Sequence, residues 1–422
     1  MHFTKYRGFV KILMKSKSVP PYLTTMLVIA SLLIVSQVAT SVTVSALPPP
    51  TTRWVNNKVA VSTDVSCAKP GYTTISAAVA AASPGDTINV CTGTYTEQVT
   101  IGESLTLQEV PYPHSTSPAP TIQAPATMTA DALFPNYFNI VTITGATTTA
   151  AIIGFTVTGP VSTAQVGCNT GNSGIGIFVE AGATATIHND TIEHIREQPV
   201  VQCAAYGVGI LVGRASLSTT GKATISHTNI FDYQKGGIIV DNTGSTATIT
   251  GNTITGWPLA FQGANSIQIA QNGIQISRGA VATVSSNTVS SNLCPLGGTC
   301  GADLIALTQA TGILLYQSGS GTSVKSNTVS GNDVGIYVYA APSATTVTLN
   351  SASSNRYAGI AFFDGTYTAS SNMVHGPGNV GIAAVADVSN TAVTLSSNTI
   401  HGNTASIGAY AGSGLTATVL FS

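Results

Sequence analysis

The sequence repeats one short segment, in which an Asn and a β-branched residue precede a Gly-Ile pair, as in KSNTVSGNDVGIYV at residues 325–338. Close copies are ITGNTITG at 249–256, SSNTVSSN at 285–292 and LSSNTIHGN at 395–403. Aligning them gives one column of Asn, with Asp190 and Thr228 in the same place upstream: Asn252, Asn287, Asn327, Asn350, Asn372 and Asn398. A second column holds the Gly before each apolar strand: Gly176, Gly209, Gly237, Gly273, Gly312, Gly335, Gly359, Gly381 and Gly408. The smallest intervals are 22 to 24 residues, which indicates a solenoid rather than ordinary domains.

Each repeat has room for three short strands with β-branched residues at alternating positions, as in TATIT, NTITG and the Gly-Ile strand. Leucine-rich repeats have a similar length, but their leucine consensus is absent. Stacked coils would lie about 4.8 Å apart, with Val and Ile pointing inward. Asn at a turn tolerates a left-handed backbone and can pair with the amides of neighbouring coils. The repeat therefore predicts an all-β fold, a right-handed parallel β-helix of about nine to ten coils with three strands per coil.

The first 46 residues differ from the rest. Five basic residues (Lys5, Arg7, Lys11, Lys15 and Lys17) precede an apolar run at 26–35, and no acidic residue occurs before Asp64. Small residues follow and end in VTVSA at Ala46. This layout predicts a secretory signal at 1–46 with cleavage after Ala46, followed by a linker at 47–59; an uncleaved membrane anchor is the alternative.

Without those five of the fifteen basic residues, ten would face sixteen acidic ones, a net charge of −6. No basic stripe exists to meet phosphates, so we expect no nucleic-acid partner. We expect a secreted protein, a monomer, without stable membrane insertion after signal removal.

Residues 72–101, YTTISAAVAAASPGDTINVCTGTYTEQVTI, place a short Ala-rich helix before the first strand, where it would cap the open end of the solenoid. This stretch resembles the opening segment of the pectin-lyase-like superfamily, T-I-x-x-A-(x)n-P-G-D-T-I-x-V-x-x-G-x-Y-x-E. The resemblance covers essentially residues 60–422 and implies a β-helix domain there. It does not imply one activity, because the fold carries lyases, glycosidases, esterases and non-catalytic proteins. The paired-aspartate and Gly-His-Gly motifs of polygalacturonases, the Arg motifs of many pectate lyases and the methylesterase signatures are absent from the sequence.

All six cysteines follow the predicted signal, as expected in an oxidising compartment. Aligning the repeats puts Cys168 and Cys203 in equivalent loops of successive coils, and Cys294 and Cys300 flank PLGGT within one loop. We expect each of these two pairs to form a disulfide, which leaves Cys67 with Cys91. Free buried thiols are the alternative, and no Cys or His sits at zinc-ligand spacing.

Long insertions precede the Gly-Ile strand in several coils, whereas the coil between Ile230 and Gly237 has only FDYQKG. Long loops on both sides of a short one predict a groove whose floor holds Phe231, Asp232, Tyr233 and Lys235. The family resemblance implies a cleft beside the same sheet.

Residues 180–241 hold ten of the 26 charged side chains that follow the predicted signal. Glu180 and Asp241 are expected in one outward row of the Gly-Ile sheet, two coils or roughly 9 to 10 Å apart, near the upper end of the spacing in inverting glycosidases. Arg214 is expected between them, where it could bind a sugar carboxylate. For hydrolysis, Glu180 and Asp241 are the acid and base; for β-elimination, Lys235 or Arg214 is the base, and Asp232 with Asp241 could hold Ca²⁺. The alternative is that these are solvated charges of a loop-rich segment.

Aromatic residues supply candidates for sugar contact. Tyr316, Tyr339 and Phe363 are expected in one outward row on consecutive coils, either as a platform for sugar rings or as a ladder that stabilises the sheet. Trp257 at the groove edge and Tyr233 on its floor are further candidates. We therefore expect a protein that binds and possibly cleaves a polysaccharide, with no certain cofactor; a non-catalytic adhesion or cell-wall solenoid is the alternative. The net charge slightly disfavours a highly anionic polymer unless calcium intervenes.

Overall fold

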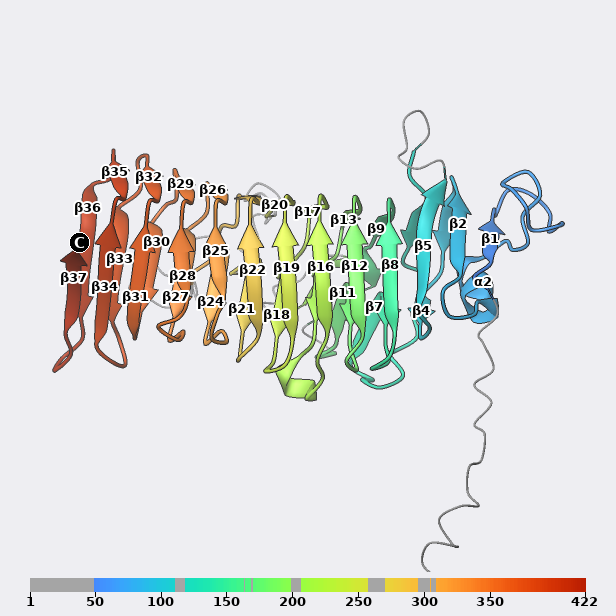
Figure 1. Cartoon of the computed structure of the whole chain (residues 1–422), viewed down its shortest axis with the longest axis horizontal. Coiled ribbons are helices and arrows are strands. Elements are labelled where there is room, and N and C mark those ends of the chain that lie inside the picture. Colours follow the sequence, from blue (N-terminus) through green and yellow to red (C-terminus); the bar gives the residue numbers. More distant parts are fainter. Residues whose placement is uncertain are drawn as a thin grey trace, which may run out of the picture. The chain divides into compact units, whose positions relative to one another are not determined.

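The computed structural model describes residues 49–110, 118–162, 164–167, 170–198, 206–256, 270–294, 304 and 309–422. Within them the chain winds through three long parallel sheets, whose strands follow one another side by side along the solenoid (Figure 1). Each complete coil contributes one strand to each sheet, so the predicted all-β parallel β-helix is confirmed. We call the sheets A, B and C.

Sheet A has thirteen strands. They are β1 (Thr52–Val55), β2 (Thr87–Cys91), β5 (Leu105–Val110), β8 (Thr149–Ile153), β12 (Thr184–His188), β16 (Lys222–Ser226), β19 (Thr246–Thr250), β22 (Val281–Ser285), β25 (Ser323–Lys325), β28 (Thr346–Thr348), β31 (Thr366–Ser370), β34 (Thr391–Ser396) and β37 (Ala417–Phe421).

Sheet B has eleven short strands that follow the Asn turn. They are β3 (Thr94–Thr96), β6 (Thr121–Gln123), β9 (Thr156–Thr158), β13 (Thr191–Glu193), β17 (Asn229–Phe231), β20 (Thr253–Thr255), β23 (Thr288–Ser290), β26 (Thr328–Ser330), β29 (Ser351–Ser353), β32 (Met373–His375) and β35 (Thr399–His401).

Sheet C contains the Gly-Ile strands and also has eleven members. They are β4 (Val99–Ile101), β7 (Tyr137–Ile143), β11 (Ser173–Val179), β15 (Val208–Val212), β18 (Gly236–Asp241), β21 (Asn272–Ser277), β24 (Thr311–Tyr316), β27 (Val334–Tyr339), β30 (Ala358–Phe363), β33 (Val380–Ala386) and β36 (Ala405–Ala411). A small separate sheet pairs β10 (Val161–Ser162) with β14 (Glu197–Gln198), and a 3₁₀ turn, η1, spans Ala215–Leu217.

Inward side chains of all three sheets form one continuous apolar core. In sheet C, Ile210, Ile238 and Ile274 pair in register on successive strands and are fully buried. In sheet A, Ile225 and Ile249 do the same. Burying each such side chain stabilises the fold by about 1.5–3 kcal/mol, so the stacked apolar columns are the main favourable contribution.

The Asn column forms a hydrogen-bonded ladder inside the turn between sheets A and B. Asn327 Oδ1 accepts the backbone N–H and the Nδ2–H of Asn287, each at 3.0 Å, and Asn327 donates in the same way to Asn350 Oδ1. The left-handed conformation that we expected of the Asn belongs instead to the residue before it: Ser326, directly before Asn327, has φ +57°. From Asn252 to Asn372, the backbone N–H and the Nδ2–H of each Asn in the column donate to the Asn of the next coil.

A second ladder lies five residues further along, and the sequence analysis missed it. Asn292 donates its backbone N–H and Nδ2–H to Asn332 Oδ1, and Asn332 donates in the same way to Asn355 Oδ1. Its signal was present as the second Asn of SSNTVSSN and SGND.

The Gly column of sheet C is a steric requirement of the stack. A Cβ placed on Gly335 would lie 2.4 Å from the carbonyl oxygen of Gly359, and one on Gly312 would lie 2.7 Å from that of Gly335. Any larger residue would push successive coils apart at this position.

The N-terminal part of the described chain also agrees with the sequence. The helix α2 (Ile75–Ala81) is the expected capping helix, and its Ile75 and Ala78 are fully buried in the core. Glu97 accepts the N–H groups of Ile75 and Ser76 at the start of this helix. β1 lies inside residues 47–59, which we expected as a linker, and it pairs with β2 instead.

The predicted Cys67–Cys91 disulfide is confirmed and ties this segment to β2. Cys168, Cys203 and Cys300 lie outside the described residues, as does the predicted signal at 1–46. The Cys168–Cys203 and Cys294–Cys300 pairings and the cleavage after Ala46 therefore remain predictions. Cys294 is disulfide-bonded. Across the part of the chain that the structure describes, no helix has the length and apolar character needed to cross a membrane.

Replacing Asn327 with Ala should destabilise the fold by about 3 kcal/mol or more, because it leaves buried amides of Asn287 and the Val284 carbonyl without partners. Urea unfolding of the full chain measures this. The matched control is Thr328→Ala, on the exposed side of the same turn, which should change the unfolding free energy by less than about 1 kcal/mol. Equal effects of the two substitutions would contradict the role given to the ladder.

Candidate functional site

Two connected hollows form a groove on the outer face of sheet C. The smaller, of about 170 Å³, lies over β7 to β21, and the larger, of about 410 Å³, continues over β21 to β27. Both are lined by Lys235, Gln275 and Arg278, so they are two parts of one groove that runs along the solenoid. Of the four residues expected on the groove floor, Phe231, Asp232, Tyr233 and Lys235, only Lys235 is among its lining residues.

A buried carboxylate holds two arginines at the groove. Asp241, the last residue of β18, is 0% exposed. Its Oδ2 lies 3.6 Å from Arg214 Nη1 and accepts the N–H of Ala215 at 2.9 Å, while its Oδ1 lies 3.1 Å from Arg278 Nη1. The Ser277 hydroxyl also donates to Oδ1, at 2.6 Å. Both carboxylate oxygens are therefore occupied, and Asp241 fixes the two guanidinium groups, which are 30% and 48% exposed.

Lys235 brings a third cation to the same hollow from the other end of β18. Its Nζ donates to the backbone oxygen of Ala270, and burial lowers its pKa to about 8. An amine with such a pKa is partly neutral near physiological pH and can accept a proton.

Glu180 lies in the outward row that the sequence predicts, but its surroundings differ from those expected. Val179, Val212 and Val240 pair in register on successive strands. The residues that follow them therefore form one outward row: Glu180, Gly213 and Asp241. Arg214 comes after Gly213 and lies one position beyond this row. Glu180 is 1% exposed, and burial, followed by the nearby charge of Asp131, raises its pKa to about 7.

The hydrolytic acid–base pair predicted from Glu180 and Asp241 is not favoured by this geometry. Neither residue is among the groove-lining residues, and a general base needs contact with the water or substrate proton it removes. Asp241 is a positioning residue for the arginines.

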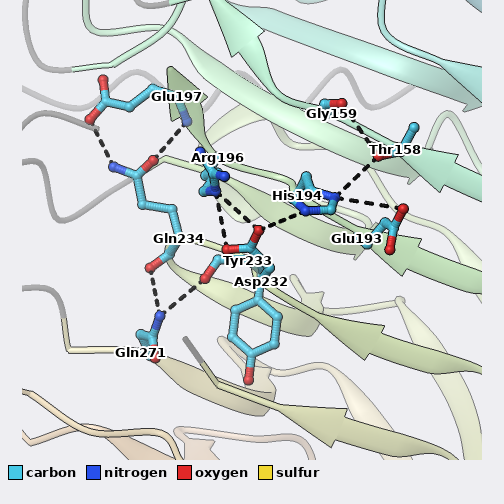
Figure 2. A network of polar contacts seen from close by, with 10 residues as sticks. All are labelled: Thr158, Gly159, Glu193, His194, Arg196, Glu197, Asp232, Tyr233, Gln234 and Gln271. Atoms are coloured by element: carbon cyan, nitrogen blue, oxygen red, sulfur yellow. Dashed lines mark hydrogen bonds and ion pairs between the residues drawn. The ribbon is translucent and has the colours of Figure 1, made fainter. Parts of the chain in front are cut away.

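Asp232 belongs to a different cluster (Figure 2). It follows β17 at the junction of sheets B and C, where Arg196 Nε donates to both of its carboxylate oxygens at 3.1 Å and His194 Nε2 lies 3.3 Å away. The six residues of β18, about 20 Å of extended chain, separate it from the end of the strand where Asp241 sits. A calcium site shared by Asp232 and Asp241 is therefore wrong. Among the described residues no group of three or more His, Cys, Asp or Glu is arranged to hold a metal ion.

Tyr233 is a core residue, and its predicted contact with a sugar is wrong. It is 0% exposed, and its hydroxyl donates to Asn292 Oδ1 at 2.5 Å, at the end of the second Asn ladder. Trp257 lies outside the described residues.

The aromatic row of sheet C is a ladder. The rings of Tyr316 and Tyr339 stack at 5.2 Å with an interplanar angle of 6°, Tyr339 and Phe363 follow at 6.3 Å, and the Arg278 guanidinium lies 5.9 Å from the Tyr316 ring centre. Phe363 is 4% exposed. The facing surfaces of Tyr316 and Tyr339 thus cover each other, and a sugar ring would not find a free aromatic face between them. The two tyrosines nevertheless line the larger hollow.

Comparisons with known proteins agree with this architecture. Residues 208–397 match the family described as right handed beta helix region. The chain is similar to the native GH136 lacto-N-biosidase from Eubacterium ramulus, at 11% identity and a TM-score of 0.57 over 88% of this chain and 68% of that chain. It is similar to pectate lyase Pel9A, at 13% identity and a TM-score of 0.46 over 82% of this chain and 79% of that chain. No curated protein matches the chain in sequence. The fold is a right-handed parallel β-helix.

Sequence reasoning about this β-helix missed Arg278 and Gln275. Arg278 follows Ser277, which pairs with Asp241, and it therefore occupies the position after the outward row, as Arg214 does two coils earlier. Extending the alignment one residue past each Gly-Ile strand would have placed Arg278 beside Arg214.

Replacing Glu180 with Gln should change how stability depends on pH. Because the pKa of Glu180 is raised from 4.5 to about 7, the folded state carries a penalty that grows as pH rises through this window and is complete above it. The variant should match the parent at pH 4 and be more stable at pH 8, by up to about 3 kcal/mol. Chemical unfolding at both pH values tests this, with Glu103→Gln on an exposed loop as the control. A pH-independent difference would show that the buried charge is not the cause.

Proposed function

We propose that this protein binds an acidic polysaccharide in the groove on sheet C and cleaves it by β-elimination. The observation that carries the proposal is that Arg214, Lys235 and Arg278 all line one hollow. The two arginines lie at the end of β18 where Asp241 is their buried counter-charge, and Lys235 precedes the other end of the strand. This local excess of positive charge lies on a chain whose predicted mature form is net acidic. From the net charge alone we expected that an anionic polymer is disfavoured. The local positive charge favours such a polymer instead.

The two arginines supply the binding part of the chemistry. Planar guanidinium groups recognise carboxylates through paired, charge-assisted hydrogen bonds, and Asp241 keeps both side chains in place before substrate arrives. The same groups would stabilise the extra negative charge that develops on the sugar carboxylate when the neighbouring carbon loses its proton.

Lys235 is proposed as the base. Its neutral amine takes the proton from the carbon next to the carboxylate, the electron pair forms a carbon–carbon double bond, and the glycosidic C–O bond at the following carbon breaks. The leaving oxygen takes a proton from water, the Lys235 ammonium returns its proton to the solvent, and the new chain end is unsaturated. The lowered pKa of Lys235 supplies the neutral amine that this step needs.

Secretion is part of the same proposal. Support comes from the basic and apolar character of residues 1–46 and from the Cys67–Cys91 disulfide, a bond typical of oxidising compartments.

Lys235→Ala should lower the elimination rate by about 10²- to 10⁴-fold, measured as absorbance of unsaturated product from a panel of acidic polysaccharides. Lys235→Arg should also be inactive near pH 8, because a guanidinium stays protonated. In the parent protein, kcat/KM should rise with pH through about 8, since the pKa of Lys235 sets the neutral fraction.

The matched control is Lys222→Ala, which removes an exposed lysine from sheet A. The proposed role of Lys235 fails if both lysine variants retain the parent rate. Reducing ends without unsaturated product would indicate hydrolysis. Binding without any product across the panel would favour a non-catalytic cell-wall or matrix solenoid.

A further inference from the structure

The two parts of the groove differ in chemistry. The smaller hollow is lined by all three cations, Arg214, Lys235 and Arg278. Apart from the residues that the two hollows share, the larger hollow is lined by uncharged groups, among them Asn272, Gln309, Thr311, Tyr316 and Tyr339, and by one acid, Asp387. An acidic sugar is stabilised by the first set of groups and receives no counter-charge from the second.

The uncharged part is built for hydroxyl and amide groups. Thr311 Oγ1 donates to Asn272 Oδ1 at 2.7 Å, and Asn272 Nδ2 donates to Gln275 Oε1 at 2.9 Å, so the side chains are held in place. Burial and neighbouring negative charges raise the pKa of Tyr339, so its phenol stays neutral and can donate and accept. Asp387 at the far end would repel a second carboxylate.

The order of the two parts follows the solenoid. The smaller hollow lies over the earlier coils and the larger over the later ones. An extended polysaccharide advances per sugar by about the strand spacing, roughly 4.8 Å, so a chain in the groove would place successive sugars over successive coils.

We propose that the substrate is a heteropolysaccharide in which acidic sugars are linked to neutral ones. The groove binds it with one acidic unit between Arg214, Lys235 and Arg278 and the adjoining neutral units beside Thr311, Tyr316 and Tyr339. This inference rests on the proposed function for the location of binding, and it adds the composition and register of the polymer. A uniformly acidic chain would set carboxylates beside Asp387 and the neutral phenols.

The test compares three polymers of equal length with the full chain, by calorimetry at low ionic strength. They are hyaluronan, which alternates an acidic with a neutral sugar, polygalacturonate, which is acidic at every unit, and the neutral polymer xylan. Hyaluronan should bind at least 10-fold more tightly than either other polymer.

Two variants locate the register. Tyr339→Phe should weaken hyaluronan binding about 10-fold through the lost hydrogen bond to the neutral unit, and Arg278→Ala should weaken it about 10- to 100-fold through the lost charge-assisted bond. Lys222→Ala is the control for a change of charge outside the groove. Circular dichroism and the unfolding midpoint show that each variant is folded.

The outcomes separate this inference from the proposed function. Polygalacturonate bound as tightly as hyaluronan, or more so, overturns the inference, and its cleavage would leave the proposed function intact. Preferred binding of hyaluronan without unsaturated product supports the inference and overturns the elimination. Equal binding of xylan, or binding of none of the polymers, overturns both.

Discussion

The structure depends on one constraint, the parallel pairing of equivalent positions on successive coils. Because each backbone group bonds to the same position one coil away, a residue type that suits one coil must suit its neighbours. The Asn ladders and the Gly column follow from this rule: the amides satisfy buried turns, and the glycines allow the carbonyl of the next coil to approach. The same pairing brings Arg214, Asp241 and Arg278, separated along the chain, into one cluster.

The cluster shows how a nearly charge-free solenoid can hold a localised charge. Only 7% of the residues are charged, and the outward rows of sheets A and B carry mainly Thr and Ser. At the end of β18 the outward row contains the buried Asp241. The residue directly after this row is Arg214 in the preceding coil and Arg278 in the following coil. A buried carboxylate without partners would be strongly unfavourable, and two guanidinium groups held together without it would repel. The three residues are therefore stable as a set, and they leave both cations directed to the groove.

The aromatic ladder continues this arrangement along the groove. Tyr316 stacks on Tyr339 and lies beside the Arg278 guanidinium, so the ladder supports the cation cluster at one end. The tyrosine hydroxyls and the amides of Asn272 and Gln275 then give the later coils a neutral polar surface. Cations in the earlier coils and neutral polar groups in the later ones give the groove a direction.

The sequence by itself determined the solenoid, because the periods of Asn, Gly and β-branched residues each require a neighbour of the same kind one coil away. It also determined the capping helix, the Cys67–Cys91 bond and the outward row that holds Glu180 and Asp241. Only the tertiary structure decided which polar residues face the groove. Tyr233 looked like a groove residue and is buried, Asp232 pairs with Arg196 at another junction, and Arg278 joins Asp241. The physical reason is that strand periodicity fixes the side of a sheet, whereas turns and loops, which have no period, fix where a long charged side chain ends.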